Sequence, residues 1–225
     1  MTAVHVLRGG RTYVLGRHLE PNHEAASRAY PAERAPALKT VTWAHHGPIL
    51  DQGQLGSCTG NATVDVLMTE PIYRSTVQLD EASARQVYSQ ATHLDRYPGA
   101  WPPTDTGSNG LSAAKAAKRL GYVTSYRHAF GLAHTLAALA LGPVMVGTKW
   151  LGGMFALGPD GYLDCAGGVA GGHEYALIGL DVEHEYVVML NSWGSGWGAN
   201  GTAKIRWTDL GSLLSDGGDC TVLVP

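Results

Sequence analysis

Apolar positions recur at helical spacing through the first half of the chain. In the first such segment Ala62, Val66 and Leu67 share one face, and Pro71 follows as a stop. A second segment begins behind Asp80, whose carboxylate can cap the first turn of a helix. These patterns predict helices over residues 58–70, 80–93, 111–120 and 133–141.

The second half of the chain changes to short, often β-branched runs that Gly, Pro and Asp separate. The expected strands are residues 143–146, 176–180, 186–190, 203–207 and 221–224. A helical half followed by a strand half is typical of an α+β fold with two segregated lobes. A cleft between two such lobes is a common place for a functional site.

This change of pattern divides the chain into three parts. We expect an N-terminal arm at residues 1–40, a mainly helical lobe at residues 41–132 and a mainly β lobe at residues 133–225. The arm holds one strand candidate at residues 12–15, followed by a polar stretch with prolines at residues 21–36. We expect the arm to add a strand or to pack on the second lobe.

Composition and charge narrow the function classes. Hydrophobic residues make up 44 % of the 225 residues and charged residues 16 %, with a net charge of −3. No basic run indicates a nucleic-acid or anionic-membrane partner, and no apolar run approaches the roughly 18 residues of a membrane span. Residues 1–10 lack the pattern of a secretory signal. We therefore expect a cytoplasmic or phage-particle-associated protein, and the sequence leaves its oligomeric state open.

One of the three cysteines lies in a chemically suggestive setting. Cys58 follows a run of small and turn-forming residues and stands where the first helix is expected to begin. The positive end of a helix favours a thiolate over a thiol at that place. Gln52, six residues upstream, offers a side-chain amide donor. The alternative is a structural cysteine at a helix start, with Gln52 merely polar.

A histidine and an asparagine lie in two further glycine-rich segments. His173 opens an apolar strand behind Gly171 and Gly172, which leave room in front of its ring. Asn191 ends another strand, and a glycine-rich turn with two tryptophans follows it. Alternatively, the histidine simply caps its strand, and the turn serves only aromatic packing.

Together these three segments resemble the active-site segments of papain-like (C1-type) cysteine peptidases, in the family's order. Residues 52–58 resemble the segment of the nucleophile, residues 172–173 that of the histidine and residues 191–198 that of the asparagine. The resemblance covers residues 41–225 and is weak between the motifs. It implies a helical first lobe and a β-barrel-like second lobe, with the active site in the cleft between them.

The resemblance implies a cysteine endopeptidase that acts on a peptide or protein substrate through a thioester, without a cofactor or a metal. In this interpretation Cys58 is the nucleophile and His173 the base that takes its proton. Asn191 orients the base, and Gln52 donates a hydrogen bond to the oxyanion.

The resemblance also implies substrate-binding residues. Gly107 and Ser108 fall in the loop whose backbone pairs with an extended substrate, and Trp193 would shield the His–Asn pair from water. Glu174 borders the pocket for the side chain two residues upstream of the cut, where it would favour Lys or Arg. The alternative is that Glu174 turns outward and is solvated, which leaves an apolar pocket.

The chain also departs from the family's pattern. Thr59 and Leu55 stand where familiar members carry an aromatic residue and a disulfide cysteine. Residues 1–40 are too short for the usual inhibitory pro-domain, so we expect a short bacterial or phage-type form that is active as made. Cys165 and Cys220 fall near positions that pair as a disulfide in secreted members, and two free thiols are the alternative.

Two other kinds of function remain open. One is a non-catalytic papain-fold module, for example a structural component of a larger particle. The other is an amidase, isopeptidase or acyltransferase that shares the thioester chemistry. A metal site is disfavoured because the cysteines show no paired ligand spacing and the histidines form no HxxxH motif.

Overall fold

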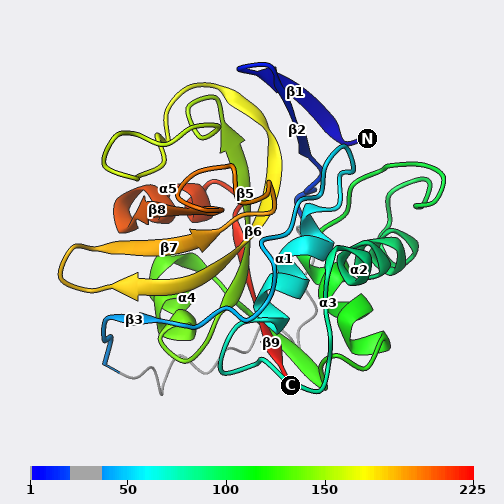
Figure 1. Ribbon diagram of the computed structural model, residues 1–225, viewed down its shortest axis with the longest axis horizontal. Coiled ribbons are helices and arrows are strands. Elements are labelled where there is room, and N and C mark those ends of the chain that lie inside the picture. Colours follow the sequence, from blue (N-terminus) through cyan, green and yellow to red (C-terminus); the bar gives the residue numbers. More distant parts are fainter. Residues whose placement is uncertain (1, 21–36) are drawn as a thin grey trace.

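A computed structural model describes residues 2–20 and 37–225 of the chain, so the polar stretch expected at residues 21–36 lies outside the described residues. The described helices surround a central sheet, and three of them pack together on one of its sides (Figure 1). These three are α1 (Cys58–Leu67), α2 (Glu81–Leu94) and α3 (Gly110–Arg119). The other two are α4 (Gly131–Leu139) and α5 (Trp207–Ser215).

Within residues 2–20 and 37–225 the sheet has seven strands, and every neighbouring pair in it is antiparallel. Six strands follow the order β4-β9-β5-β6-β7-β8, and β3 pairs with β6 beside this path. The strands are β3 (Val41–Thr42), β4 (Ser125–Ala129), β5 (Val144–Leu151), β6 (Val169–Asp181), β7 (Tyr186–Leu190), β8 (Thr202–Arg206) and β9 (Asp219–Val224).

The two faces of the sheet carry separate hydrophobic cores, because successive side chains of a strand point to opposite faces. In β5, Val144 and Val146 pack into the core that α4 and α5 cover. Met145, between them, packs into the core of α1, α2 and α3. In β7, Met189 packs into the core of α4 and α5, and Leu190 packs into the core of α1, α2 and α3. The central strands are therefore apolar at consecutive positions, which explains their short unbroken apolar runs in the sequence.

An N-terminal hairpin stands apart from this sheet (Figure 1). Strands β1 (Val4–Arg8) and β2 (Arg11–Leu15) pair antiparallel with each other and lie against β6. The strand expected at residues 12–15 is therefore present, and the chain after it leads towards the helices.

The helices expected from the sequence are present, with their boundaries set by local capping. Asp80 caps α2: its side chain accepts from the Ser83 backbone N–H at 3.0 Å, and the Ser83 hydroxyl lies 3.3 Å from the Asp80 backbone nitrogen. Asn109 caps α3 by accepting from the backbone N–H of Ser112 at 2.8 Å.

Helix α1 is buried on all sides, although its sequence predicts a single apolar face. Gly60 allows this, because a Cβ at its position would lie 2.3 Å from the carbonyl oxygen of Ala84 in α2. The polar side chain of Asn61 is satisfied by Glu81, whose carboxylate accepts from the Asn61 amide at 2.9 Å. The helix that carries Cys58 is thereby held rigidly between α2 and the sheet.

The structure corrects two sequence expectations and adds one strand. Across residues 2–20 and 37–225 the strands form an open sheet, not a closed barrel, because β8 pairs only with β7. The strand expected to reach Trp207 ends at Arg206, where helix α5 begins. Strand β4 was not expected, because its polar sequence lies on the outer edge of the sheet, where β9 is its one partner among the described strands.

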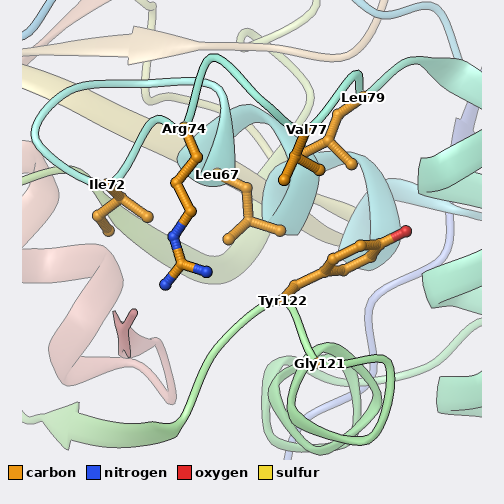
Figure 2. A pocket seen from close by; sticks show the side chains of 7 residues that line it. All are labelled: Leu67, Ile72, Arg74, Val77, Leu79, Gly121 and Tyr122. Carbon is orange, nitrogen blue, oxygen red and sulfur yellow. The ribbon is translucent and has the colours of Figure 1, made fainter.

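A small apolar pocket lies at the C-terminal end of α1 (Figure 2). Its lining comes from α1, the loop that follows it and the turn after α3: Leu67, Ile72, Arg74, Val77, Leu79, Gly121 and Tyr122. Cys58 begins the same ten-residue helix, and a helix of that length spans about 15 Å. The pocket is therefore separate from the candidate nucleophile. No helix among the described residues has both the length and the apolar character to cross a membrane.

Candidate active site

Cys58 is the first residue of α1, and its side chain is fully buried. The backbone N–H groups of Gly16, Thr59 and Glu174 act on its sulfur as hydrogen-bond donors and favour a thiolate. Burial outweighs them and raises the pKa of the Cys58 thiol to about 12. In this conformation Cys58 is therefore a neutral thiol. Its neighbours include Glu174 of β6 and Gly16 of the N-terminal arm.

His173 and Asn191 meet where two neighbouring strands come together. His173 lies in β6 and Asn191 follows β7, and the antiparallel pairing of these strands places the side chains side by side. The Asn191 Oδ1 atom lies 2.8 Å from His173 Nε2. Burial lowers the pKa of His173 to about 4, although its bond to Asn191 acts in the opposite direction. The neutral ring therefore donates from Nε2, and Nδ1 is buried without a hydrogen-bond partner among the described residues.

Aromatic rings enclose the His173–Asn191 pair. The ring centroid of Trp193 lies 4.7 Å from that of His173, and Trp150 meets the same ring edge-on at 4.9 Å. Trp197 packs edge-on against Trp193 and donates to the carbonyl oxygen of Phe155 at 3.1 Å. Sequence reasoning missed Trp150, because nothing around it in β5 resembles a motif. These rings keep water away from the histidine, which strengthens its hydrogen bond to the asparagine.

Gln52 is held by the segment that follows Asn191. The Ser192 hydroxyl donates to Gln52 Oε1 at 2.8 Å, and the Gln52 backbone N–H donates to the Ser192 carbonyl at 3.0 Å. The amide nitrogen of Gln52 is therefore fixed in direction. It donates to the carbonyl oxygens of Leu55 at 2.8 Å and Val14 at 3.1 Å. The second acceptor belongs to the N-terminal arm.

The arm runs between the segments that the sequence assigned to the substrate. The Arg17 backbone N–H donates to the carbonyl of Gly172 at 3.0 Å. On the other side, Ser108 donates to the carbonyl of Gly16 at 2.8 Å and accepts from the backbone N–H of His18 at 2.7 Å. Residues 14–18 thus bridge the segment before the histidine and the loop of the helical side. The sequence expectation, that the arm adds a strand or packs on the second lobe, did not include these contacts with the helical side.

Two glycines permit this close approach. A Cβ at Gly16 would lie 2.0 Å from the carbonyl oxygen of Gly56, two residues before Cys58. A Cβ at Gly107 would lie 2.3 Å from the carbonyl oxygen of Gly16 itself. Beside them, Tyr13 places its ring 4.6 Å from Trp193. The arm therefore covers Cys58, Gln52 and Trp193 together.

Arg17 of the arm enters a buried acidic pocket. Its Nη2 atom lies 2.6 Å from Asp219 Oδ1, and its Nε atom lies 3.9 Å from Glu174 Oε2. The side chain of Glu174 is 1 % exposed, so the outward, solvated alternative for this residue is wrong. Burial first, and Asp219 second, raise the pKa of Glu174 well above its ordinary range, against the opposing effect of Arg17.

The remaining cysteines form no bond with one another. Cys165 and Cys220 are both free thiols, so the alternative to a disulfide is the one present in the structure. Burial raises the pKa of Cys165 to about 12, with Asp209 and Asp164 acting in the same direction. Among the residues that the structure describes, no group of three or more His, Cys, Asp or Glu side chains is placed to hold a metal ion.

No model of a protein family matches the sequence, and no curated protein matches it. Solved structures do match. Xylellain, a cysteine protease from Xylella fastidiosa, is 18 % identical with a TM-score of 0.71, and the match covers 93 % of this chain and 96 % of xylellain. Procathepsin B S9 from Trypanosoma congolense is 12 % identical with a TM-score of 0.65, covering 94 % of this chain and 86 % of that one.

Bromelain from Ananas comosus, solved in complex with the inhibitor E64, is 15 % identical with a TM-score of 0.59. That match covers 84 % of this chain and 99 % of bromelain. At these identities the similarity concerns the fold. The chain therefore has the papain-like cysteine protease fold that the sequence motifs predicted.

Proposed function

We propose that this chain, which has the papain-like fold, is a cysteine endopeptidase that hydrolyses peptide bonds through a thioester acyl-enzyme. The observation that carries the proposal is the buried bond between His173 Nε2 and Asn191 Oδ1, in a segment whose next residue, Glu174, directs its backbone N–H at the thiol of Cys58. This bond leaves His173 Nδ1 as the ring nitrogen available to take a proton. Cys58 stands at a helix N-terminus, where a thiolate is favoured once water or a substrate replaces the covering arm.

Each residue then has a defined role. Cys58 gives its proton to His173 and attacks the substrate carbonyl, and the oxyanion accepts hydrogen bonds from the Gln52 amide and the Cys58 backbone N–H. One such donor contributes about 3 kcal/mol to the stability of the transition state. His173 then protonates the leaving amine, and afterwards it takes a proton from the water that hydrolyses the thioester. Asn191 holds the ring in the productive orientation throughout.

We further infer that the full chain is latent while residues 14–18 occupy the cleft. The pKa of Cys58, raised to about 12, and that of His173, lowered to about 4, keep both groups neutral at pH 7. Both shifts have burial as their largest cause, so removing the cover favours the thiolate–imidazolium pair. This replaces the expectation that the chain is active as made.

The direction of the arm explains how it can occupy the cleft without being cut. The Val14 carbonyl takes the Gln52 amide, which would otherwise bind the carbonyl under attack. Arg17 follows three residues later and enters the pocket expected for a residue upstream of the cut. A substrate with its carbonyl at Gln52 would fill that pocket with an earlier residue. The arm therefore runs opposite to a productive substrate.

The proposal is tested by covalent labelling of the thiol with E64, an epoxysuccinyl inhibitor. We expect peptide mapping to find the label on Cys58 in the parent chain, and faster labelling in a Gly16→Ala chain, whose arm no longer fits against Gly56. Cys58→Ala is the negative control, and the half-buried thiol of Cys165 reports nonspecific labelling. Absence of label on Cys58 in the Gly16→Ala chain, together with no cleavage of casein, would support a non-catalytic papain-fold module instead.

A further inference from the structure

We propose that the apolar pocket at the C-terminal end of α1 is a binding site for a small carboxylic acid that carries a short branched apolar group (Figure 2). The carboxylate of this ligand pairs with Arg74, and its apolar group fills the space beside that side chain. Because Cys58 begins α1 and the pocket lies at the other end of the helix, the proposal is independent of the proposed peptidase function.

The floor and the walls of the pocket are apolar. Leu67 and Ile72 form the floor, and both are buried in the core of α1, α2 and α3. Val77 and Leu79, from the loop between α1 and α2, form one wall, and the ring of Tyr122 forms another (Figure 2). The hydroxyl group of Tyr122 points away from Leu67 in Figure 2. An apolar group that enters the pocket is therefore removed from water on several sides, which favours its binding.

Local hydrogen bonds hold both walls in place. In the loop, the Val77 backbone N–H donates to the carbonyl oxygen of Arg74 at 3.1 Å, and the capping box of Asp80 fixes the loop where α2 begins. In the turn after α3, Gly121 has a φ of 77°, and the Tyr122 backbone N–H donates back into α3 at 3.0 Å. Because both walls are already ordered, a ligand binds without the cost of ordering them.

The size of the pocket limits the size of the apolar group. A volume of about 40 Å³ is open to the centre of a water molecule. By this measure one water needs about 10–15 Å³, so about three water-sized groups fit. This space matches a branched chain of three or four carbon atoms, and it is too small for a fused double ring.

Arg74 supplies the charge that selects an acid. Its side chain is exposed, and its guanidinium has no ion-pair or hydrogen-bond partner among the described residues. Figure 2 shows this side chain extended past Leu67, with the guanidinium on the side of Ile72. A carboxylate matches the planar fork of a guanidinium, so an apolar acid satisfies both parts of the pocket at once. A neutral ligand of the same shape leaves the guanidinium to water and binds less tightly.

The test is a titration of the full chain with sodium 4-methylpentanoate, followed through the backbone amide signals of Gly121 and Tyr122 by NMR. We expect both signals to shift to saturation, and the neutral 4-methylpentanamide to bind about fivefold less tightly, the scale of one exposed ion pair. Arg74→Gln should weaken binding of the acid by the same factor and leave binding of the amide unchanged. Arg119→Gln is the matched control, because it removes an exposed arginine near the same turn that does not line the pocket, and it should change neither affinity.

Two further acids test the size of the pocket and the source of its ligand. 2-Naphthylacetate, which carries a fused double ring, should bind more weakly than 4-methylpentanoate. Acetyl-leucine has the same branched group next to a peptide amide. Tighter binding of acetyl-leucine than of 4-methylpentanoate assigns the pocket to the C-terminal residue of a peptide, and equal or weaker binding assigns it to a free acid.

Three results would overturn the proposal. The first is that neither 4-methylpentanoate nor acetyl-leucine shifts the two amide signals. The second is equal affinity of the parent chain for 4-methylpentanoate and its amide. The third is an equal loss of affinity for the acid in Arg74→Gln and Arg119→Gln, which would show general attraction to a basic surface instead of recognition by Arg74.

Discussion

The backbone N–H of Arg17 donates to the carbonyl oxygen of Gly172 at 3.0 Å, one residue before His173. This contact joins the N-terminal arm to the strand that carries the candidate base. With the contacts to Ser108 it places residues 16–18 between the segment of His173 and the loop of Ser108. The function proposed for this chain is therefore inseparable from the release of its arm.

Gly16→Ala should activate the full chain. A Cβ at this position would lie 2.0 Å from the carbonyl oxygen of Gly56, an overlap that backbone atoms cannot avoid. The docked arm is thereby destabilised, and each 1.4 kcal/mol of destabilisation increases the open population about tenfold. We expect at least this increase in the initial rate on a fluorogenic peptide substrate.

Gly168→Ala is the matched control, because a Cβ there meets nothing within 4 Å. Its initial rate should equal that of the parent. An unchanged or lower rate in Gly16→Ala, with unaltered thermal unfolding, would contradict the latent state.

The pH dependence of Cys58 alkylation should differ between the parent and Gly16→Ala. Only the thiolate reacts with iodoacetamide, and burial raises the pKa of the parent thiol to about 12. The parent rate should therefore climb about tenfold per pH unit between about pH 6 and pH 10 without a plateau. Opening the cleft removes much of the burial, which lowers the pKa, so the variant should reach its plateau within that range.

Cys165 provides an internal reference in the same experiment. The pKa of its thiol is raised to about 12 by burial and nearby carboxylates, and none of these groups belongs to the arm. Its profile should be identical in both chains. A profile of Cys58 that does not move, although the profile of Cys165 is well determined, would show that the arm does not control the thiol.

Local chemistry made parts of the fold and of the candidate site predictable from the sequence. The cap at Asp80 acts within one turn of α2, and it was predicted correctly. His173 lies in β6 and Asn191 directly follows β7, the next strand in the chain, so their pairing needs only an antiparallel connection. These features depend on neighbours in the sequence.

Features that depend on distant contacts were not predictable in the same way. Glu174 can be buried because Arg17 of the arm lies beside it, and the sequence around residue 174 does not indicate a partner so far away in the chain. The path of the arm depends on close approach between Gly16 and Gly56, which are ordinary turn glycines in the sequence. Strand β4 belongs to the sheet although it lies within the lobe expected to be helical.

Kinetics in the Gly16→Ala background should separate the role of Gln52 as an oxyanion donor from the role of Ser192, which positions Gln52. Gln52→Ala removes an oxyanion donor and should lower kcat by about 10²–10³. Ser192→Ala removes only the hydroxyl that holds Gln52 Oε1 at 2.8 Å, so we expect a smaller loss in kcat, about tenfold, with KM unchanged.

Rescue distinguishes this positioning role from a structural one. Ser192→Thr keeps a hydroxyl donor and should recover most of the activity. Ser212→Ala, which removes an exposed hydroxyl bonded to a helix carbonyl in α5, should have no effect on kcat. A loss of kcat in Ser192→Thr equal to that in Ser192→Ala would refute positioning through the hydroxyl.

Two helical glycines should respond in opposite directions to the same substitution. Alanine normally stabilises a helix interior by about 1 kcal/mol relative to glycine, because it restricts the unfolded chain and shields the backbone. Gly211 in α5 has only ordinary contacts, 3.5 Å from Leu132, so Gly211→Ala should raise the free energy of unfolding by about this amount. Gly60 in α1 would place its Cβ 2.3 Å from the Ala84 carbonyl oxygen, so Gly60→Ala should lower the free energy of unfolding by about 1–3 kcal/mol. Urea denaturation of both variants measures the two changes. Because Gly60 lies two residues after Cys58, the strain in α1 should also slow the labelling of Cys58 by E64. A Gly60→Ala chain as stable as the Gly211→Ala chain would show that α1 and α2 are less closely packed than described.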